Sequence, residues 1–222
     1  MTAFVLVPGA CHGGWWFQPL ADELRKRGHL AHAITLPGLA DRADLLHGSV
    51  TLDTHVDDLV ATICAESIED AVLVGHSYGG SVISGVADRI PERISGLMYL
   101  DAFVPEDGES RWSITDDDHR RWFIEGAGRT GIAIDPQPFF DERATPHPLA
   151  TVMQRSRLTG AWQSVAIKHY VAATGWPGRS PFASTAERLR ADAAWTVHDL
   201  PTGHNVMVEA PDQLLELVLS VA

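Results

Sequence analysis

The 222-residue sequence has few cysteines and a deficit of basic side chains. Its two cysteines, Cys11 and Cys64, are too few for a disulfide framework and are typical of a protein from a reducing compartment. Lys and Arg number 17 against 29 Asp and Glu, which gives a net charge of −12. This acidic balance repels phosphate backbones, so we expect no nucleic-acid partner.

The sequence also has no apolar run long enough for a transmembrane helix. The opening segment Met1–Val7 is too short to cross a bilayer, and it lacks the basic residues that begin a signal peptide. We therefore expect a cytoplasmic protein without membrane association. His, Asp and Glu show no metal-ligand spacing such as H-E-x-x-H, so we expect neither a metal nor a cofactor.

Strand-like and helix-like segments alternate along most of the chain, for example Phe4–Val7 followed by 19–27, and Ile94–Leu100 late in the first half. Such alternation predicts an α/β fold with a mostly parallel sheet of about six strands and helices on both faces. Residues 1–222, 45% hydrophobic, fit one domain. Between about 104 and 167 the alternation stops, which predicts a short helical cap inserted over the carboxyl ends of the strands.

The most informative stretch is Val72–Ser81, in which an apolar run ends in Gly-His-Ser-Tyr-Gly and a helix-like segment follows. G-x-S-x-G between a strand and a helix is typical of a nucleophile elbow, a sharp turn that exposes a serine at its tip. Ser77 is therefore the predicted nucleophile, and a purely structural turn is the alternative. The glycines leave room where side chains would collide with the neighbouring strand and helix.

A serine nucleophile needs a base, and the base needs a carboxylate partner. In this type of fold the histidine follows the last strand, which favours His204 in the loop 201–205. The usual place for the acid, the loop 174–179 after the fifth strand, contains no carboxylate. Asp101, directly after the fourth strand, is the predicted acid, and Asp199 is the alternative.

The tetrahedral intermediate of such a reaction requires N–H donors for its oxyanion. The backbone N–H of Tyr78, the residue after the serine, is one candidate. The glycine-rich first loop, Pro8–Gly14, can supply the second, for which we expect Ala10.

The segments Val5–Trp15 and Gly75–Gly80 together resemble the α/β-hydrolase superfamily. Within it the chain is most similar to the branch of plant methylesterases, hydroxynitrile lyases and their bacterial esterase relatives. The resemblance covers nearly the whole length, and it implies the same four assignments as the residues themselves: Ser77, His204, Ala10 and Tyr78.

The sequence departs from that branch at two places. Many members have histidine where Pro8 stands, which alters the first loop. The aspartate that usually follows the penultimate strand is missing, and an acid relocated to Asp101 resembles the arrangement of pancreatic-type lipases.

Aromatic residues are frequent in and near the insertion, which predicts an apolar pocket above Ser77. The alternative is that these aromatics form the small core of the insertion itself. The candidate pocket residues are His12, Trp112, Trp122, Phe123 and Trp162. With no evident counter-charge among them, neutral substrates are expected to be preferred over charged ones.

These features predict a serine hydrolase that cleaves a small, largely apolar carboxylic ester through an acyl-enzyme. One alternative is a cofactor-free lyase of the hydroxynitrile type. In those relatives a threonine of the first loop and a lysine after the penultimate strand assist catalysis. Here Gly9 occupies the first position and 172–176 contains no lysine. Another alternative is a binding protein with a vestigial triad. The partner is a small-molecule ester, and the sequence leaves a homodimer open.

Overall fold

Six parallel strands form the central sheet of the computed structural model, which describes residues 1–178 and 180–222. Their spatial order is β2-β1-β3-β4-β7-β8, and each neighbouring pair is parallel. The strands are β1 (Ala3–Val7), β2 (Leu30–Ala33), β3 (Ala71–His76), β4 (Ile94–Leu100), β7 (Ile167–Ala173) and β8 (Thr196–Leu200). This confirms the predicted fold class.

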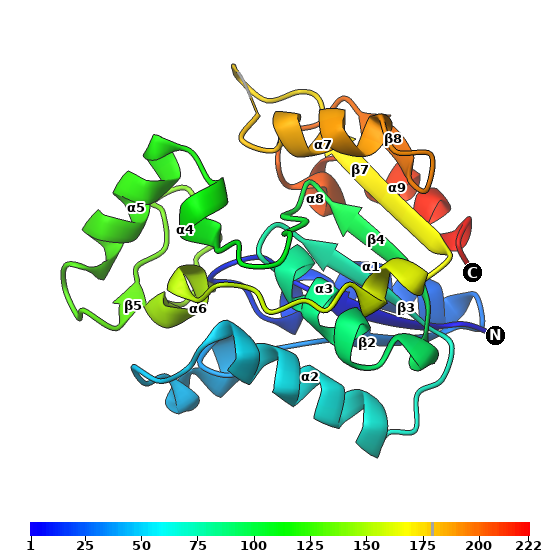
Figure 1. Cartoon of the computed structure of the whole chain (residues 1–222), viewed down its shortest axis with the longest axis horizontal. Helices are drawn as coiled ribbons and strands as arrows, with labels where there is room; N and C mark the ends of the chain where they lie inside the picture. Colours follow the sequence, from blue (N-terminus) through cyan, green and yellow to red (C-terminus); the bar gives the residue numbers. More distant parts are fainter. Residues whose placement is uncertain (179) are drawn as a thin grey trace.

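Helices cover both faces of the sheet (Figure 1). Side chains of successive strand residues point to opposite faces, so each apolar strand contributes to two cores. On one face Val5 and Leu73 pack with α2 (Leu52–Ala65), α3 (Gly79–Arg89) and α7 (Ala183–Arg190). On the other face Leu6 and Val74 pack with three helices. These are α1 (Gln18–Lys26), α8 (Val206–Glu209) and α9 (Pro211–Leu219).

Element ends differ from the predicted ones by a few residues. Thr51 caps α2 as expected, since its side chain accepts a hydrogen bond from the backbone of Thr54 in a reciprocal capping box. β8 extends to Leu200, so both His198 and Asp199 lie within the strand. The helix expected near Pro181 begins at Ala183.

The insertion contains a cap, residues 111–153, that lies to one side of the sheet (Figure 1). It consists of α4 (Arg111–Ile114), α5 (Asp117–Ala127) and α6 (Leu149–Met153) with a hairpin of β5 (Ala133–Ile134) and β6 (His147–Pro148). This hairpin could not be predicted, because strands of two residues leave no detectable periodicity. Four short 3₁₀ segments also occur among the described residues: η1 (Gly14–Trp16), η2 (Ala40–Leu45), η3 (Pro91–Arg93) and η4 (Ala161–Ser164).

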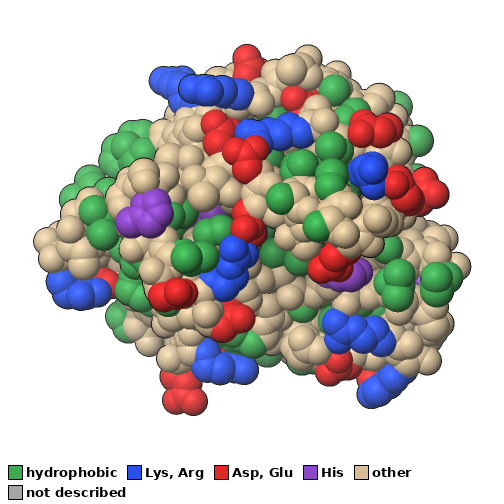
Figure 2. Space-filling view, turned by 90° about the horizontal axis from the view of Figure 1, so that it is seen from below, with side chains coloured by type: hydrophobic (Ala, Val, Ile, Leu, Met, Phe, Trp, Pro, Cys, Tyr) green, Lys and Arg blue, Asp and Glu red, His purple; other side chains and the backbone are tan. Residues whose placement is uncertain are grey.

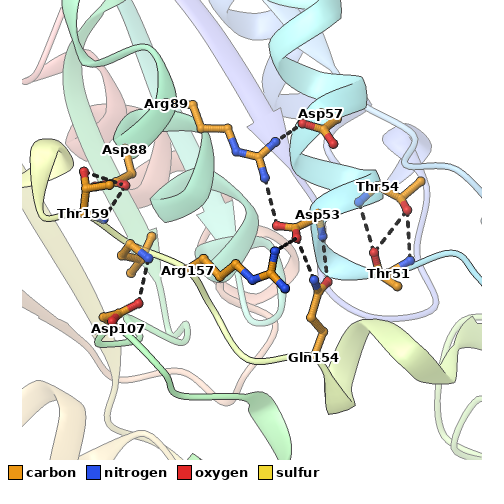
Figure 3. Close-up of polar contacts among 11 residues, drawn as sticks. Thr51, Asp53, Thr54, Asp57, Asp88, Arg89, Asp107, Gln154, Arg157 and Thr159 are labelled. Carbon is orange, nitrogen blue, oxygen red and sulfur yellow. Dashed lines mark hydrogen bonds and ion pairs between the residues drawn. The ribbon is translucent and has the colours of Figure 1, made fainter.

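The segment that follows the cap contacts α2 and α3 through hydrogen bonds (Figure 3). The side chain of Gln154 accepts from the backbone N–H of Asp53 at 2.9 Å and donates to its carboxylate at 2.7 Å. Asp88, at the end of α3, accepts hydrogen bonds from the backbone N–H groups of Thr159 and Gly160. These contacts fix where the cap rejoins the sheet.

Charged side chains of both signs are interspersed on the face drawn in Figure 2. None of the helices in the described part of the chain is long and apolar enough to cross a membrane.

Candidate active site

Ser77 lies at the turn between β3 and α3 with a backbone φ of +52°. A non-glycine residue in this left-handed region is strained, and such strain is typical of a nucleophile elbow. The turn depends on Gly79, because a Cβ at that position would lie 2.4 Å from the carbonyl oxygen of Val7. The backbone N–H of Ser77 donates to Leu100 at the carboxyl end of β4. The serine is half-buried.

Nδ1 of His204 lies 2.7 Å from Oδ2 of Asp101, although the two residues are 103 positions apart in sequence. Asp101 follows β4 and His204 follows β8, so the sheet brings them to the same edge. Asp199, the alternative acid, is half-exposed and pairs with Arg190 instead. The structure thus joins His204 to the predicted carboxylate, and the catalytic role of the pair stays a prediction.

Asp101 is almost fully buried, and its surroundings affect its pKa in opposite directions. Burial raises the pKa of the carboxyl to about 7, whereas N–H groups from Trp176 and Ala173 lower it. These donors contact Oδ2 at 3.0 Å and Oδ1 at 3.3 Å, respectively. With the His204 ring as a further donor, every polar contact of the carboxyl suits an acceptor. We therefore assign the ionised form to Asp101.

Burial lowers the pKa of His204 to about 3, and the charges that His119 and His12 would carry act in the same direction. The Asp101 carboxylate opposes this shift, because it stabilises the imidazolium at a distance of 2.7 Å. A ring that is neutral near pH 7, with Nδ1–H directed at Asp101, leaves the lone pair of Nε2 free to accept a proton.

Aromatic rings hold the His204 imidazole on several sides. Phe182 stacks on it at 5.2 Å with an interplanar angle of 7°, and Trp176 lies 5.3 Å away. His76 packs at 4.4 Å and donates from Nε2 to the carbonyl oxygen of His204 at 3.0 Å. Sequence reasoning did not single out Trp176 or Phe182. The sequence feature that could have pointed to Trp176 is its position in the loop 174–179, where an acid was expected and is missing.

The first loop approaches the elbow closely, because a Cβ on Gly9 would lie 3.0 Å from the Cβ of Ser77. Among the described residues, no hydrogen-bond acceptor is found for the backbone N–H of Ala10 or of Tyr78. Both predicted oxyanion donors are thus free of competing partners, and their role stays a prediction.

The residues predicted to line a pocket lie in three places. His12 joins the first loop to the cap, because its ring lies 5.4 Å from that of Phe140. Trp122 contacts the same Phe140 ring at 5.6 Å and belongs with Phe123 and Trp112 to the small core of the cap, which is the alternative that the sequence left open.

The structure does not bring Trp162 to this group. Its indole packs 6.2 Å from Trp195, within the large core beside α3.

The insertion also contains a buried cation that sequence reasoning did not single out. Arg111, the first residue of α4, is only 1% exposed and has no carboxylate partner among the described residues. Its Nη2 donates to Ser156 Oγ at 3.1 Å and to the carbonyl of Glu109 at 3.4 Å, and the guanidinium carbon lies 5.9 Å from the centre of the Phe103 ring. Nε and Nη1 are buried and without hydrogen-bond partners. Because those two nitrogens are closed off from solvent, the expectation of neutral substrates is retained.

Within residues 1–178 and 180–222, no cluster of three or more His, Cys, Asp or Glu side chains is placed to hold a metal ion.

Comparison with known proteins gives one relative over nearly the whole chain and others over part of it. A carbendazim hydrolyzing esterase from Nocardioides sp. (strain SG-4G) is 39% identical over 97% of this chain and 98% of its own. Methylesterase 10 of Arabidopsis thaliana is 37% identical over 46% of this chain and 38% of its own.

Among solved structures, an extracellular alpha/beta-hydrolase from a Paenibacillus species matches with a TM-score of 0.84 and 21% identity. That match covers 100% of this chain and 99% of the other, and it supports the fold. The model of the Alpha/beta hydrolase family matches residues 4–217. The elbow, the Asp101–His204 pair and these matches lead to one conclusion: the chain belongs to the alpha/beta hydrolase family.

Proposed function

We propose that this protein hydrolyses small, largely apolar carboxylic esters through an acyl-enzyme on Ser77. The observation that carries the proposal is the contact of 2.7 Å between His204 and the buried Asp101, at the sheet edge where the strained Ser77 also lies. A histidine held by a carboxylate beside a strained serine suits nucleophilic catalysis rather than ligand binding alone.

In this mechanism Nε2 of His204 accepts the proton of the Ser77 hydroxyl while the oxygen attacks the ester carbonyl. Asp101 holds the ring in the Nδ1–H tautomer and stabilises the imidazolium. The N–H groups of Ala10 and Tyr78 stabilise the oxyanion. His204 then protonates the leaving alcohol, and water, activated by the same base, releases the acid and restores the serine.

The relatives support an ester as the substrate. The Nocardioides protein is named for the hydrolysis of carbendazim, and the plant relatives include methylesterases. Where the first loop meets the cap, the side chains in contact are the rings of His12 and Phe140, and such surroundings suit a substrate with an apolar or aromatic group.

The test combines labelling with turnover. A fluorophosphonate probe should label the wild type, and the wild type should hydrolyse a short aryl ester, methyl jasmonate or carbendazim. Ser77→Ala should lose both properties. Ser81→Ala is the matched control, because this buried serine lies in the first turn of α3, four residues after Ser77. Labelling that persists in Ser77→Ala would contradict the proposal, as would a wild type inactive on every ester.

A further inference from the structure

The first loop is strained at Cys11, the residue that follows the proposed oxyanion donor Ala10. Cys11 has a φ of +68°, in the left-handed region that disfavours side chains. A non-glycine residue keeps this conformation only when its surroundings hold it there. Ala10 and Cys11 share a peptide group, so the contact that holds the Cys11 N–H also orients this group, whose carbonyl oxygen lies 2.7 Å from Nδ1 of His12. The N–H of Ala10 lies on the preceding peptide group and is positioned through the Cα of Ala10.

The cap supplies both hydrogen bonds that hold the backbone of Cys11. Its N–H donates to Nδ1 of His147 at 3.3 Å, and its carbonyl oxygen accepts from the N–H of Thr145 at 2.9 Å. Thr145 also accepts the N–H of Ala40 at 2.8 Å through its hydroxyl. The strained residue beside Ala10 is thus clamped by a segment more than 130 positions later, in and next to β6.

The hydrogen-bond network selects one tautomer of His147, which is fully buried. The hydroxyl of Thr151 donates its only proton to the carbonyl of Pro148 at 2.7 Å, so it can only accept from Nε2 of His147 at 2.8 Å. With the proton on Nε2, Nδ1 carries a lone pair and accepts the N–H of Cys11. Thr151 therefore keeps His147 in the form that the first loop needs.

A second buried histidine holds the other oxyanion residue in the same way. Nε2 of His55 donates to the carbonyl of Pro37 at 2.9 Å, which leaves Nδ1 to accept the hydroxyl of Tyr78 at 2.8 Å. The Tyr78 ring also packs on His147 at 4.6 Å. The residues that carry the two proposed donors, Ala10 and Tyr78, are thus connected to one buried cluster.

We propose that His147 is a positioning residue of the oxyanion hole, acting through Cys11 to orient the N–H of Ala10. This inference rests on the proposed function. Its consequence is that the oxyanion hole is complete only when the cap contacts the first loop. The cap then serves catalysis as well as substrate binding, because β6 carries the acceptor for the first loop.

The experiment compares His147→Leu with His147→Asn. Leucine fills a similar volume without an acceptor, whereas the asparagine oxygen can accept the Cys11 N–H from near the position of Nδ1. In His147→Leu, kcat on a short aryl ester should fall by about tenfold to a hundredfold, since small misplacements at a site have effects of this size. KM should change little. Affinity for a trifluoromethyl ketone, which mimics the tetrahedral intermediate, should fall by the same factor as kcat/KM. His147→Asn should recover most of the loss.

Rates are taken per active molecule, counted by fluorophosphonate titration, so that partial unfolding does not imitate the effect. Thr151→Val is a second variant in case His147→Leu does not fold, since loss of the hydroxyl frees the ring to place its proton on Nδ1. It should show the same fall in kcat with little change in KM. His169→Leu, a half-buried histidine of β7, is the control and should match the wild type.

Wild-type kcat per active molecule in His147→Leu, or in Thr151→Val where the leucine variant does not fold, would overturn the inference, as would a change in KM alone. A wild type without ester turnover would instead end the proposed function, and this inference with it.

Discussion

Oδ2 of Asp101 lies between two N–H groups, Nδ1 of His204 at 2.7 Å and Nε1 of Trp176 at 3.0 Å. Trp176 belongs to the loop after β7, the place where similar enzymes usually have their acid. In this chain the carboxylate comes from the end of β4 instead, and the loop after β7 contributes a donor that orients it. The end of β7 thus carries no acid, but its loop donates a hydrogen bond to the acid at the end of the neighbouring strand β4.

Trp176→Phe tests this relationship. The indole N–H lowers the pKa of Asp101, which burial raises to about 7, so its removal should raise that pKa further. Asp101 would then be protonated at a higher pH, and the acidic limb of the pH profile of kcat/KM should move upward. The measurement is the pH profile of ester hydrolysis for both proteins. An unchanged acidic limb would show that Trp176 only fills space.

Asp101→Asn should lower kcat by up to about 10⁴, because an amide cannot keep His204 in the Nδ1–H tautomer. Asp199→Asn is the matched control. Asp199 pairs with Arg190 at the surface, and an exposed pair contributes at most about 1 kcal/mol to stability. Steady-state kinetics of the two variants decide between the acids, and a large loss only in Asp199→Asn would contradict the assignment.

The parts of this molecule that local patterns encode could be predicted. The parallel sheet follows from alternating apolar strands, and the elbow follows from glycines that only a crowded turn requires. The contact between Asp101 and His204 followed from chain order together with the absence of a carboxylate in 174–179.

What the sequence did not reveal depends on contacts between distant segments. The hydrogen bonds of His147 and Thr145 to Cys11 bridge the cap and the first loop, and no periodicity encodes them. Trp162 was wrongly predicted to line the pocket because it lies in the insertion. Its segment, η4, packs in the large core beside α3 instead.

Arg111→Met should stabilise the protein. Burial lowers the pKa of Arg111 to about 10, so the side chain remains a cation with two N–H-bearing nitrogens unpaired. Unsatisfied buried donors cost about 1–3 kcal/mol each, and two of them outweigh the hydrogen bonds of Nη2 to Ser156 and to the Glu109 carbonyl, so the free energy of unfolding should rise by about 1–2 kcal/mol. Urea denaturation measures this value. Arg121→Met, in an exposed pair with Asp118, is the control and should change it by less than about 1 kcal/mol. A clear loss of stability in Arg111→Met would contradict the argument.

Stability should fall as the pH is lowered from about 6.5 towards 4. Burial lowers the pKa of His55 to about 4 and that of His76 and His147 well below the ordinary value. In this range the unfolded chain binds protons that the native state cannot, and each such proton contributes a slope of about 1.4 kcal/mol per pH unit. The raised pKa of Asp101 acts in the opposite direction, but it concerns one group.

Urea denaturation at several pH values measures this slope. His55→Gln should give a shallower slope than the wild type, whereas His47→Gln, at an exposed position, should leave it unchanged. A slope near zero between pH 6.5 and 4 would show that the buried histidines take up protons in the native state.

Ester hydrolysis should exceed cyanohydrin cleavage. Cyanide leaves as an anion and needs a nearby cation, as well as a group that assists the substrate hydroxyl. Gly9 offers no hydroxyl beside Ser77 that could assist the substrate. In the loop after β7, Trp176 supplies no cation, and its indole N–H donates to Asp101. Lys168 donates to the carbonyl of Gln163 near the start of β7, at the opposite end of that strand from the site. Ester cleavage needs neither group, because His204 can protonate the leaving alcohol. Mandelonitrile and a short aryl ester should be compared under the same conditions, with Ser77→Ala as the control. Cyanide release faster than ester turnover, and absent in Ser77→Ala, would assign the site to lyase chemistry instead.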